Sequence, residues 1–146
     1  MTADQRAMQW VLDALGTVPL VQGRVYHGRS DDLGDSQDDD LPAIVVRTNS
    51  EVPSSPSPRT LHTARSIEVR GVLRVPAVDY EPDMDALLRE MYHALLPLWD
   101  PESPPAGTTE IRFTGVEYEH PASGSEIASV LINLNVSYVL TCKEGT

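Results

Sequence analysis

The residues able to do acid–base or metal chemistry are scattered along this chain. Its four histidines are His27, His62, His93 and His120, and no HxH or HxxxH spacing places two of them on one face of a strand or helix. We interpret them as isolated surface residues. The single cysteine, Cys142, lies in no CxxC pattern, so neither an internal disulfide nor a thiolate metal site is expected. The chain is predicted to carry no metal and no cofactor.

The densest group of possible metal ligands is an acidic run from Arg29 to Asp40. An EF-hand would need glycine at its sixth position and glutamate at its twelfth, and neither is in register here. We interpret the run as a mobile, solvent-exposed loop, and loose divalent binding stays open as an alternative. The run contains six aspartates: Asp31, Asp32, Asp35, Asp38, Asp39 and Asp40.

Nucleophile and phosphate-binding motifs are missing from the sequence. It has no GxSxG, GxGxxG or GxxxxGK[ST] pattern, and the small residues from Ser123 to Ser125 are typical of a hairpin turn. Trp10, Tyr92 and Trp99 could stack on a ligand, but such aromatics more often join helices to a sheet or fill an interface. We therefore predict no enzyme. A small ligand-binding domain, with its pocket between a helix and the sheet, remains an alternative.

The charge balance limits the classes of partner. The formal net charge is −11, and tight nucleic-acid binding needs a basic surface that displaces counterions. DNA is therefore expected only as a neighbour that is not held, although such acidity can also serve solubility alone. The N-terminal residues lack the pattern of a secretion signal, and no window reaches the 18 or so apolar residues of a membrane span. We expect a protein of the reducing cytoplasm, neither secreted nor embedded in a membrane.

Two helices are predicted. The segment Thr2–Leu15 has apolar residues at spacings of three and four, with Thr2 and Gln5 as a capping box and Gly16 as a left-handed stop. A second helix opens at Pro82 and ends before Pro97. Its apolar stripe consists of Met84, Leu87, Leu88, Met91 and Leu95.

Strand patterns occupy most of the remaining chain. The segments Gly23–His27 and Leu41–Arg47 read as short strands, and the alternation around Ile67–Val75 predicts a third. Ile111–Tyr118 and Ile127–Leu140 should form a hairpin, with the last strand central to the sheet. Between these, Asn49–Arg59 alternates serine with proline and is predicted to be an extended loop or arm.

Arginines mark the third predicted strand. Arg65, Arg70 and Arg74 are expected on its wet side, where they could pair with carboxylates of a neighbouring subunit. Solvated surface arginines are the competing interpretation. In sum, residues 1–146 are predicted to form one α+β domain. It has a largely antiparallel sheet of about five strands, two helices packed on one face, and long loops.

The order of these segments resembles that of the tail terminator proteins of long-tailed phages, the minor tail protein U type. The resemblance spans GRVYHGR, the acidic insertion, LPAIVVR, the proline–serine segment, DMDALLREMYHALL and the closing NLNVSYVLT. It implies a virion protein, assembled in the host cytoplasm, that forms a hexameric ring on the last ring of tail tube protein. Such a ring ends tube polymerisation and joins the tube to the head-side connector, while DNA passes through its channel without specific binding.

A closed ring also needs different contact patches on the two sides of each subunit. The loops Arg29–Asp40 and Asn49–Thr63 are candidates for reaching neighbours, because loops longer than about a dozen residues are usually functional or disordered. Another neck component, such as a tail completion or head closure protein, is an alternative of the same class. A toxin–antitoxin or regulatory partner is a third. The predicted interface residues are Asp31, Asp32, Asp38, Asp39, Asp40, Arg59, Arg65, Arg70 and Arg74.

Overall fold

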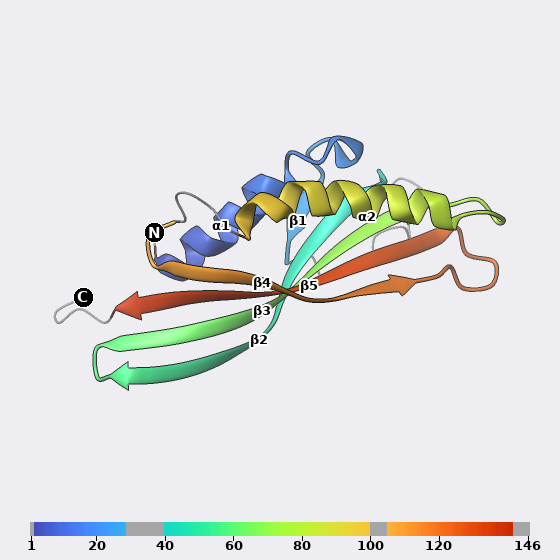
Figure 1. The fold of residues 1–146 in the computed structure, drawn as a ribbon. Coiled ribbons are helices and arrows are strands. Elements are labelled where there is room, and N and C mark those ends of the chain that lie inside the picture. The colour runs from blue at the N-terminus through green and yellow to red at the C-terminus, as the bar shows by residue number, and fades with distance from the viewer. Residues whose placement is uncertain (1, 29–39, 100–104, 142–146) are drawn as a thin grey trace.

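The fold is α+β, as predicted, and is built around one twisted sheet. In this computed structural model, residues 2–28, 40–99 and 105–141 are described. The sheet has five strands in the order β1-β2-β3-β5-β4, with β1 parallel to β2 and all other neighbours antiparallel. Both helices lie on one face of it (Figure 1). The elements are α1 (Ala3–Leu15), β1 (Val25–His27), β2 (Ala43–Ser57), β3 (Thr60–Arg74), α2 (Glu81–Leu95), β4 (Thr108–Glu119) and β5 (Ile127–Thr141), with short 3-10 turns at Pro19–Val21 and Leu96–Leu98.

Helix α1 begins as predicted and ends differently. The Thr2 backbone N–H donates to Gln5 Oε1 at 2.9 Å and the Thr2 side chain accepts from the Gln5 backbone, so the expected capping box is present. Gly16 does not take the left-handed conformation that we predicted, because its φ is −62°. The chain leaves the helix through right-handed turns, in which the Gly16 N–H still bonds to Leu12 O at 2.9 Å. The left-handed residue lies further on, at Gln22, after the 3-10 turn.

Helix α2 covers the centre of the sheet with the predicted stripe. Glu81 and Asp83 in the first turn complement the positive end of the helix dipole, and Pro82 occupies a position where no N–H is needed. Pro97 does not stop the chain abruptly, since Leu96–Leu98 continues as a 3-10 turn. The residues of α2 that are buried are Met84, Leu87, Leu88, Met91 and Leu95, which confirms the predicted stripe.

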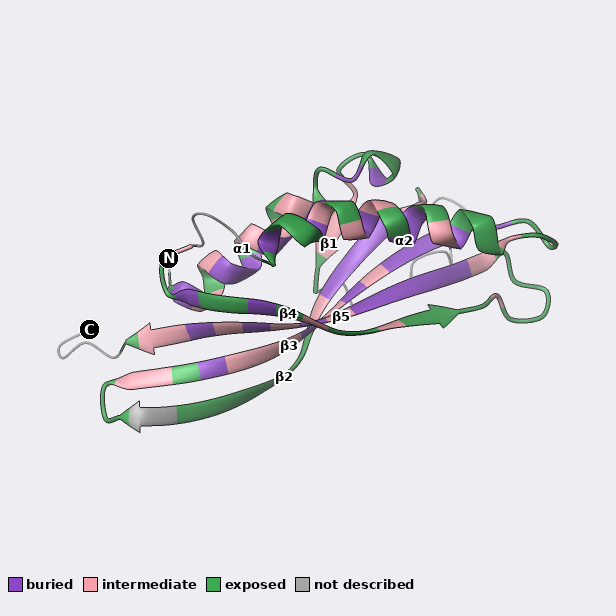
Figure 2. Ribbon diagram, viewed as in Figure 1, coloured by how far each residue is buried: buried purple, intermediate pink, exposed green. Residues whose placement is uncertain are grey.

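Strands β3 and β5 form the middle of the sheet, as expected for the longest alternating patterns. Their register is continuous from Thr60 opposite Thr141 to Arg74 opposite Ile127. Gly71 lies where α2 approaches most closely, because an added Cβ would stand 2.7 Å from Met91 Sδ. Figure 2 shows the buried residues of both strands beneath the helices. Those of β5 on the helix face include Val130, Ile132, Leu134, Val136 and Tyr138.

The proline–serine segment is not the free arm that we predicted. It is the outer half of β2 and pairs with β3, with Glu51 opposite Arg65 and Pro53 opposite Thr63. Proline is tolerated here because β1 pairs only with Ile44–Val46, so that the far edge of this half of β2 has no described neighbour. The hairpin formed by β2 and β3 extends past the helices (Figure 1).

A small second core lies on the sheet face opposite the helices. Ala43, Val45 and Val72 are buried there, with Tyr26 and other half-buried side chains packed around them. The predicted first strand is shorter than expected, since only Val25–His27 pairs with β2. Most other residues of this face are polar or charged, although Leu131 is also buried there, and we call it the bare face.

Candidate interaction surfaces

Arg65 holds the outer sheet to helix α1. The predicted position on the wet side was wrong for this arginine, because the strand alternation places residue 65 on the same face as Ile67, beneath the helices. Its Nη2 lies 2.5 Å from Glu51 Oε1 and 3.7 Å from Asp4 Oδ2. Its guanidinium carbon lies 5.4 Å from the centre of the Tyr138 ring. Arg65 thereby joins α1, β2, β3 and β5.

The Tyr138 hydroxyl, on β5, binds the same Glu51 carboxylate that pairs with Arg65. It donates to Glu51 Oε1 at 2.9 Å, and its residue is only 2% exposed. Burial raises the pKa of the phenol, and the hydrogen bond to the Glu51 carboxylate raises it further, to about 12. The phenol therefore stays neutral and serves as a donor rather than as an acid or base. The contacts of Tyr138 and Arg65 with Glu51 therefore hold the strands and α1 together.

Arg70 and Arg74 lie on the bare face, as predicted, but their carboxylate partners are in the same chain. Arg70 Nη1 lies 2.5 Å from Glu119 Oε2, and Nη2 lies 3.5 Å from Glu68 Oε1. Burial acts to lower the pKa of Arg70, but the hydrogen bond and charge of Glu119 outweigh it, so the net shift is upward. Arg74 lies 3.9 Å from Glu126. Contact of either arginine with a neighbouring subunit stays a prediction.

The remaining predicted interface residues fall on the periphery or outside the described residues. Asp31, Asp32, Asp38 and Asp39 lie outside them, and Asp40 is exposed. Arg59 is exposed in the turn that joins β2 to β3. Among the described members of this set, Arg65 lies on the helix face of β3 while Arg70 and Arg74 lie on the bare face, so these arginines do not share one surface.

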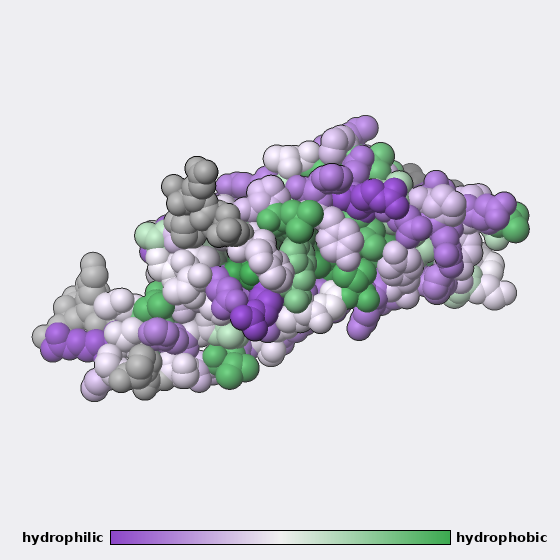
Figure 3. All heavy atoms as spheres, viewed as in Figure 1, coloured by the Kyte–Doolittle hydropathy of each residue, from purple (hydrophilic) through white to green (hydrophobic). Residues whose placement is uncertain are grey.

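An aromatic group over β4 includes Tyr92 and Trp99, two of the aromatics that the sequence offered for packing or an interface. The Trp99 ring stacks on Phe113, with centroids 5.3 Å apart and planes 13° apart, and Tyr92 meets Phe113 edge-on at 6.1 Å. Despite these contacts, Trp99 is 50% exposed and Leu96 is 54% exposed. Figure 3 shows hydrophobic side chains gathered between α2 and β4. We call Leu96, Trp99 and Phe113 the aromatic knob.

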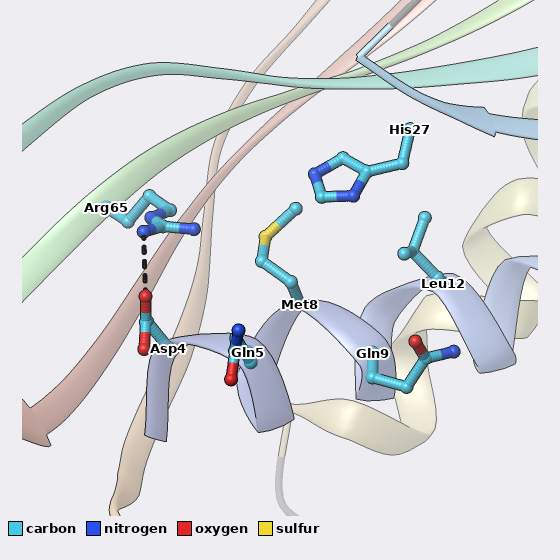
Figure 4. Close-up of a pocket in the computed structure, with 7 residues that line it drawn as sticks. All are labelled: Asp4, Gln5, Met8, Gln9, Leu12, His27 and Arg65. Atoms are coloured by element: carbon cyan, nitrogen blue, oxygen red, sulfur yellow. Dashed lines mark ion pairs between the residues drawn. The ribbon is translucent and has the colours of Figure 1, made fainter. Parts of the chain in front are cut away.

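A groove lies on the other side of α1, toward β1. It has a volume of about 360 Å³. Figure 4 shows Met8 and Leu12 from α1 and His27 from β1 pointing into the same space, with the Asp4–Arg65 ion pair at one end. We call it the α1 groove. Its lining residues are Asp4, Gln5, Met8, Gln9, Leu12, His27 and Arg65.

Two charged side chains near opposite edges of the sheet lack strong partners. Arg47, on β2, makes only a 3.7 Å contact with Glu68, and its buried Nε has no hydrogen bond to a described residue. Glu117, on edge strand β4, is exposed, and no ion pair joins its carboxylate to another residue of the described chain. Through the registers both belong to the bare face. A weakly paired cation and an anion with no ion pair to a described residue therefore lie near opposite edges of the sheet.

The histidines and acidic residues form no metal-binding cluster in the described part of the chain. Within residues 2–28, 40–99 and 105–141, no three His, Cys, Asp or Glu side chains are close enough to hold a metal ion. His120 is not isolated, since its Nδ1 lies 3.0 Å from the Tyr80 hydroxyl. None of the described helices is long and apolar enough to cross a membrane.

Comparison with solved structures gives a likeness in fold. No family model matches the sequence. No curated protein matches it either. Among solved structures, the fold is similar to a chain of the virion of a native gene transfer agent particle, with a TM-score of 0.52 and 7% sequence identity. The match covers 94% of this chain and 95% of that chain. At this identity the likeness concerns the fold alone.

Proposed function

We propose that this chain is a structural virion protein of a phage that forms a ring at the head-proximal end of the tail tube. The ring ends polymerisation of the tube and offers the surface to which the head-side connector binds. In this role the protein positions partners by assembly and needs no active site. DNA passes through the ring without being held.

The observation that carries this proposal is the likeness in fold to a virion chain over nearly the full length of both chains. A fragment or a common motif could match many unrelated proteins, whereas this match includes the sheet and both helices of one domain. It agrees with the order of segments that resembles the tail terminator proteins. Fold alone does not assign function, so the residues must also suit the role.

The bare face suits a wall that DNA passes without binding. Two of its arginines are closely engaged by carboxylates of the same chain, in the pairs Arg70–Glu119 and Arg112–Glu110, at 2.5 and 2.6 Å, whereas Arg47 makes only the 3.7 Å contact with Glu68. Phosphate binding would require such cations to exchange these partners, in a chain whose net charge is −11. We therefore expect no measurable affinity for duplex DNA at physiological salt.

The two long sides of the subunit differ, which suits a closed ring. The side bounded by β4 carries the aromatic knob, and the side bounded by β1 and β2 carries the α1 groove. Rings are built from heterologous contacts, in which one patch meets a different patch on the next copy. A two-fold dimer would instead need one self-complementary patch.

The proposal is tested by polymerising the tail tube protein of the same phage with and without this chain. We expect tubes of limited length in its presence, with the chain bound at one end in negative-stain images of labelled protein. Tubes that grow equally long and carry no label would contradict the proposal. Binding to the portal or connector but not to the tube would favour the alternative of another neck component.

A further inference from the structure

The aromatic knob is an ordered apolar patch that stays half exposed on the helix face of the sheet. Trp99 follows the 3-10 turn after α2, and its stacking on Phe113 restricts its ring before any partner binds. Half of its surface is nevertheless exposed to water, as is that of Leu96. A large aromatic side chain that is already ordered loses little entropy on docking, so it is well suited to anchor an interface.

The α1 groove has the size and chemistry to receive such a ring. A volume of about 360 Å³ corresponds to roughly a dozen water molecules at about 30 Å³ each, which is room enough for an indole. Met8 and Leu12 offer apolar surface, and the Arg65 guanidinium, at the end of the groove, already lies beside one aromatic ring. A guanidinium and the face of an aromatic ring attract each other through a cation–π interaction.

Charge and strand direction favour a second copy of this chain as the occupant. The registers place Arg47 level with Gly115, two residues from Glu117, which is about 7 Å along a strand. Because β2 and β4 run in opposite directions, neighbouring copies with parallel axes would place β4 of one antiparallel to β2 of the next. That arrangement brings the weakly paired Arg47 and the Glu117 carboxylate to the same face of the interface.

Resting on the ring-forming role above, we propose that copies of this chain associate in solution by inserting Trp99 of one copy into the α1 groove of the next. Arg47 and Glu117 pair across the same contact, on the bare face. The knob and the groove lie on different sides of one subunit, so each copy uses one patch for each neighbour. The contact is therefore heterologous and propagates around a ring.

Two single substitutions each remove one half of this contact. Trp99→Glu removes the knob, and Leu12→Glu places a charge in the groove. Each variant alone should be monomeric by light scattering after size exclusion, with association weakened by roughly 30-fold or more. Mixed in equal amounts, they should form a dimer and nothing larger, since one intact knob meets one intact groove. Val78→Glu, in the exposed loop between β3 and α2, should assemble like the wild type.

The mixing step also controls for misfolding, because a dimer forms only from two folded chains. Assembly of Trp99→Glu like the wild type would overturn the inference while leaving the ring-forming role intact. Assembly of Leu12→Glu like the wild type would show that the knob binds elsewhere. Two monomeric variants that give no dimer on mixing would overturn it as well. A wild-type chain that stays monomeric at its highest soluble concentration would also overturn the inference. The tube polymerisation assay would then test the proposed function separately.

Discussion

Gly71 should be the position in the sheet least able to accept a methyl group. Its Cβ would lie 2.7 Å from Met91 Sδ, 2.9 Å from Leu87 Cδ2 and 3.2 Å from Val130 Cγ2. All three side chains are fully buried, so the core must shift to admit the new atom. Such overpacking costs about 1–3 kcal/mol. The loss of backbone freedom in the unfolded chain returns about 0.4–1 kcal/mol. The net loss for Gly71→Ala should be about 1–2 kcal/mol.

Gly115 provides the matched control. It also lies in a strand, β4, but an added Cβ would meet nothing within 4 Å. Gly115→Ala should therefore be neutral or stabilise the protein by about 0.5 kcal/mol. Urea unfolding of both variants measures the difference, and thermal midpoints should separate by roughly 3–6 °C. If Gly71→Ala proves as stable as Gly115→Ala, the close approach of α2 to the sheet is wrong.

Three further outcomes follow from described contacts. Tyr138→Phe should reduce the pH dependence of stability. The folded-state pKa is raised from 10.0 to about 12, so the wild type loses stability as pH rises through that interval, and urea unfolding at alkaline pH should show a smaller loss in the variant. Arg70→Ala should cost about 1–3 kcal/mol in the free energy of unfolding, because it removes the charged hydrogen bond of the half-buried Arg70 guanidinium to Glu119 and its ion pair with Glu68. Arg112→Ala, whose ion pair is exposed, should change it by less than about 0.5 kcal/mol. Gln5→Ala removes the bond to the Thr2 N–H and should cost about 0.5–1 kcal/mol, measured by thermal unfolding.

The parts of the fold that could be predicted are those whose pattern is local. The apolar stripe of α2 and the alternation of β5 each predict, from one segment alone, which side of the element faces the core. The hairpin of β4 and β5 follows from two such segments and the turn between them. These elements agree with the structure to within a few residues.

The proline–serine segment could not be predicted because its structure depends on a distant partner. Residues 49–57 carry no apolar alternation, and local propensity disfavours a strand there. Pairing with β3 supplies the backbone hydrogen bonds that hold the segment in a strand. The missing neighbour on its far edge removes the hydrogen-bonding demand that would otherwise exclude Pro53.

The candidate interface was only partly predictable, for a similar reason. Strict alternation along β3 would have separated Arg65 from Arg70, since an odd difference in number reverses the face. The importance of Trp99 depends on its stacking with Phe113 and on the groove across α1, which segments far apart in the chain create. The pattern around Trp99 shows only an aromatic residue after a helix.

A cryo-electron microscopy reconstruction of the neck of phage particles that contain this chain would show where it lies. We expect a closed ring of this chain between the last ring of tail tube protein and the head-side connector, with the bare face lining the channel. Particles in which this chain is absent from the neck, or occupies the capsid or the distal tail, would contradict the proposed function.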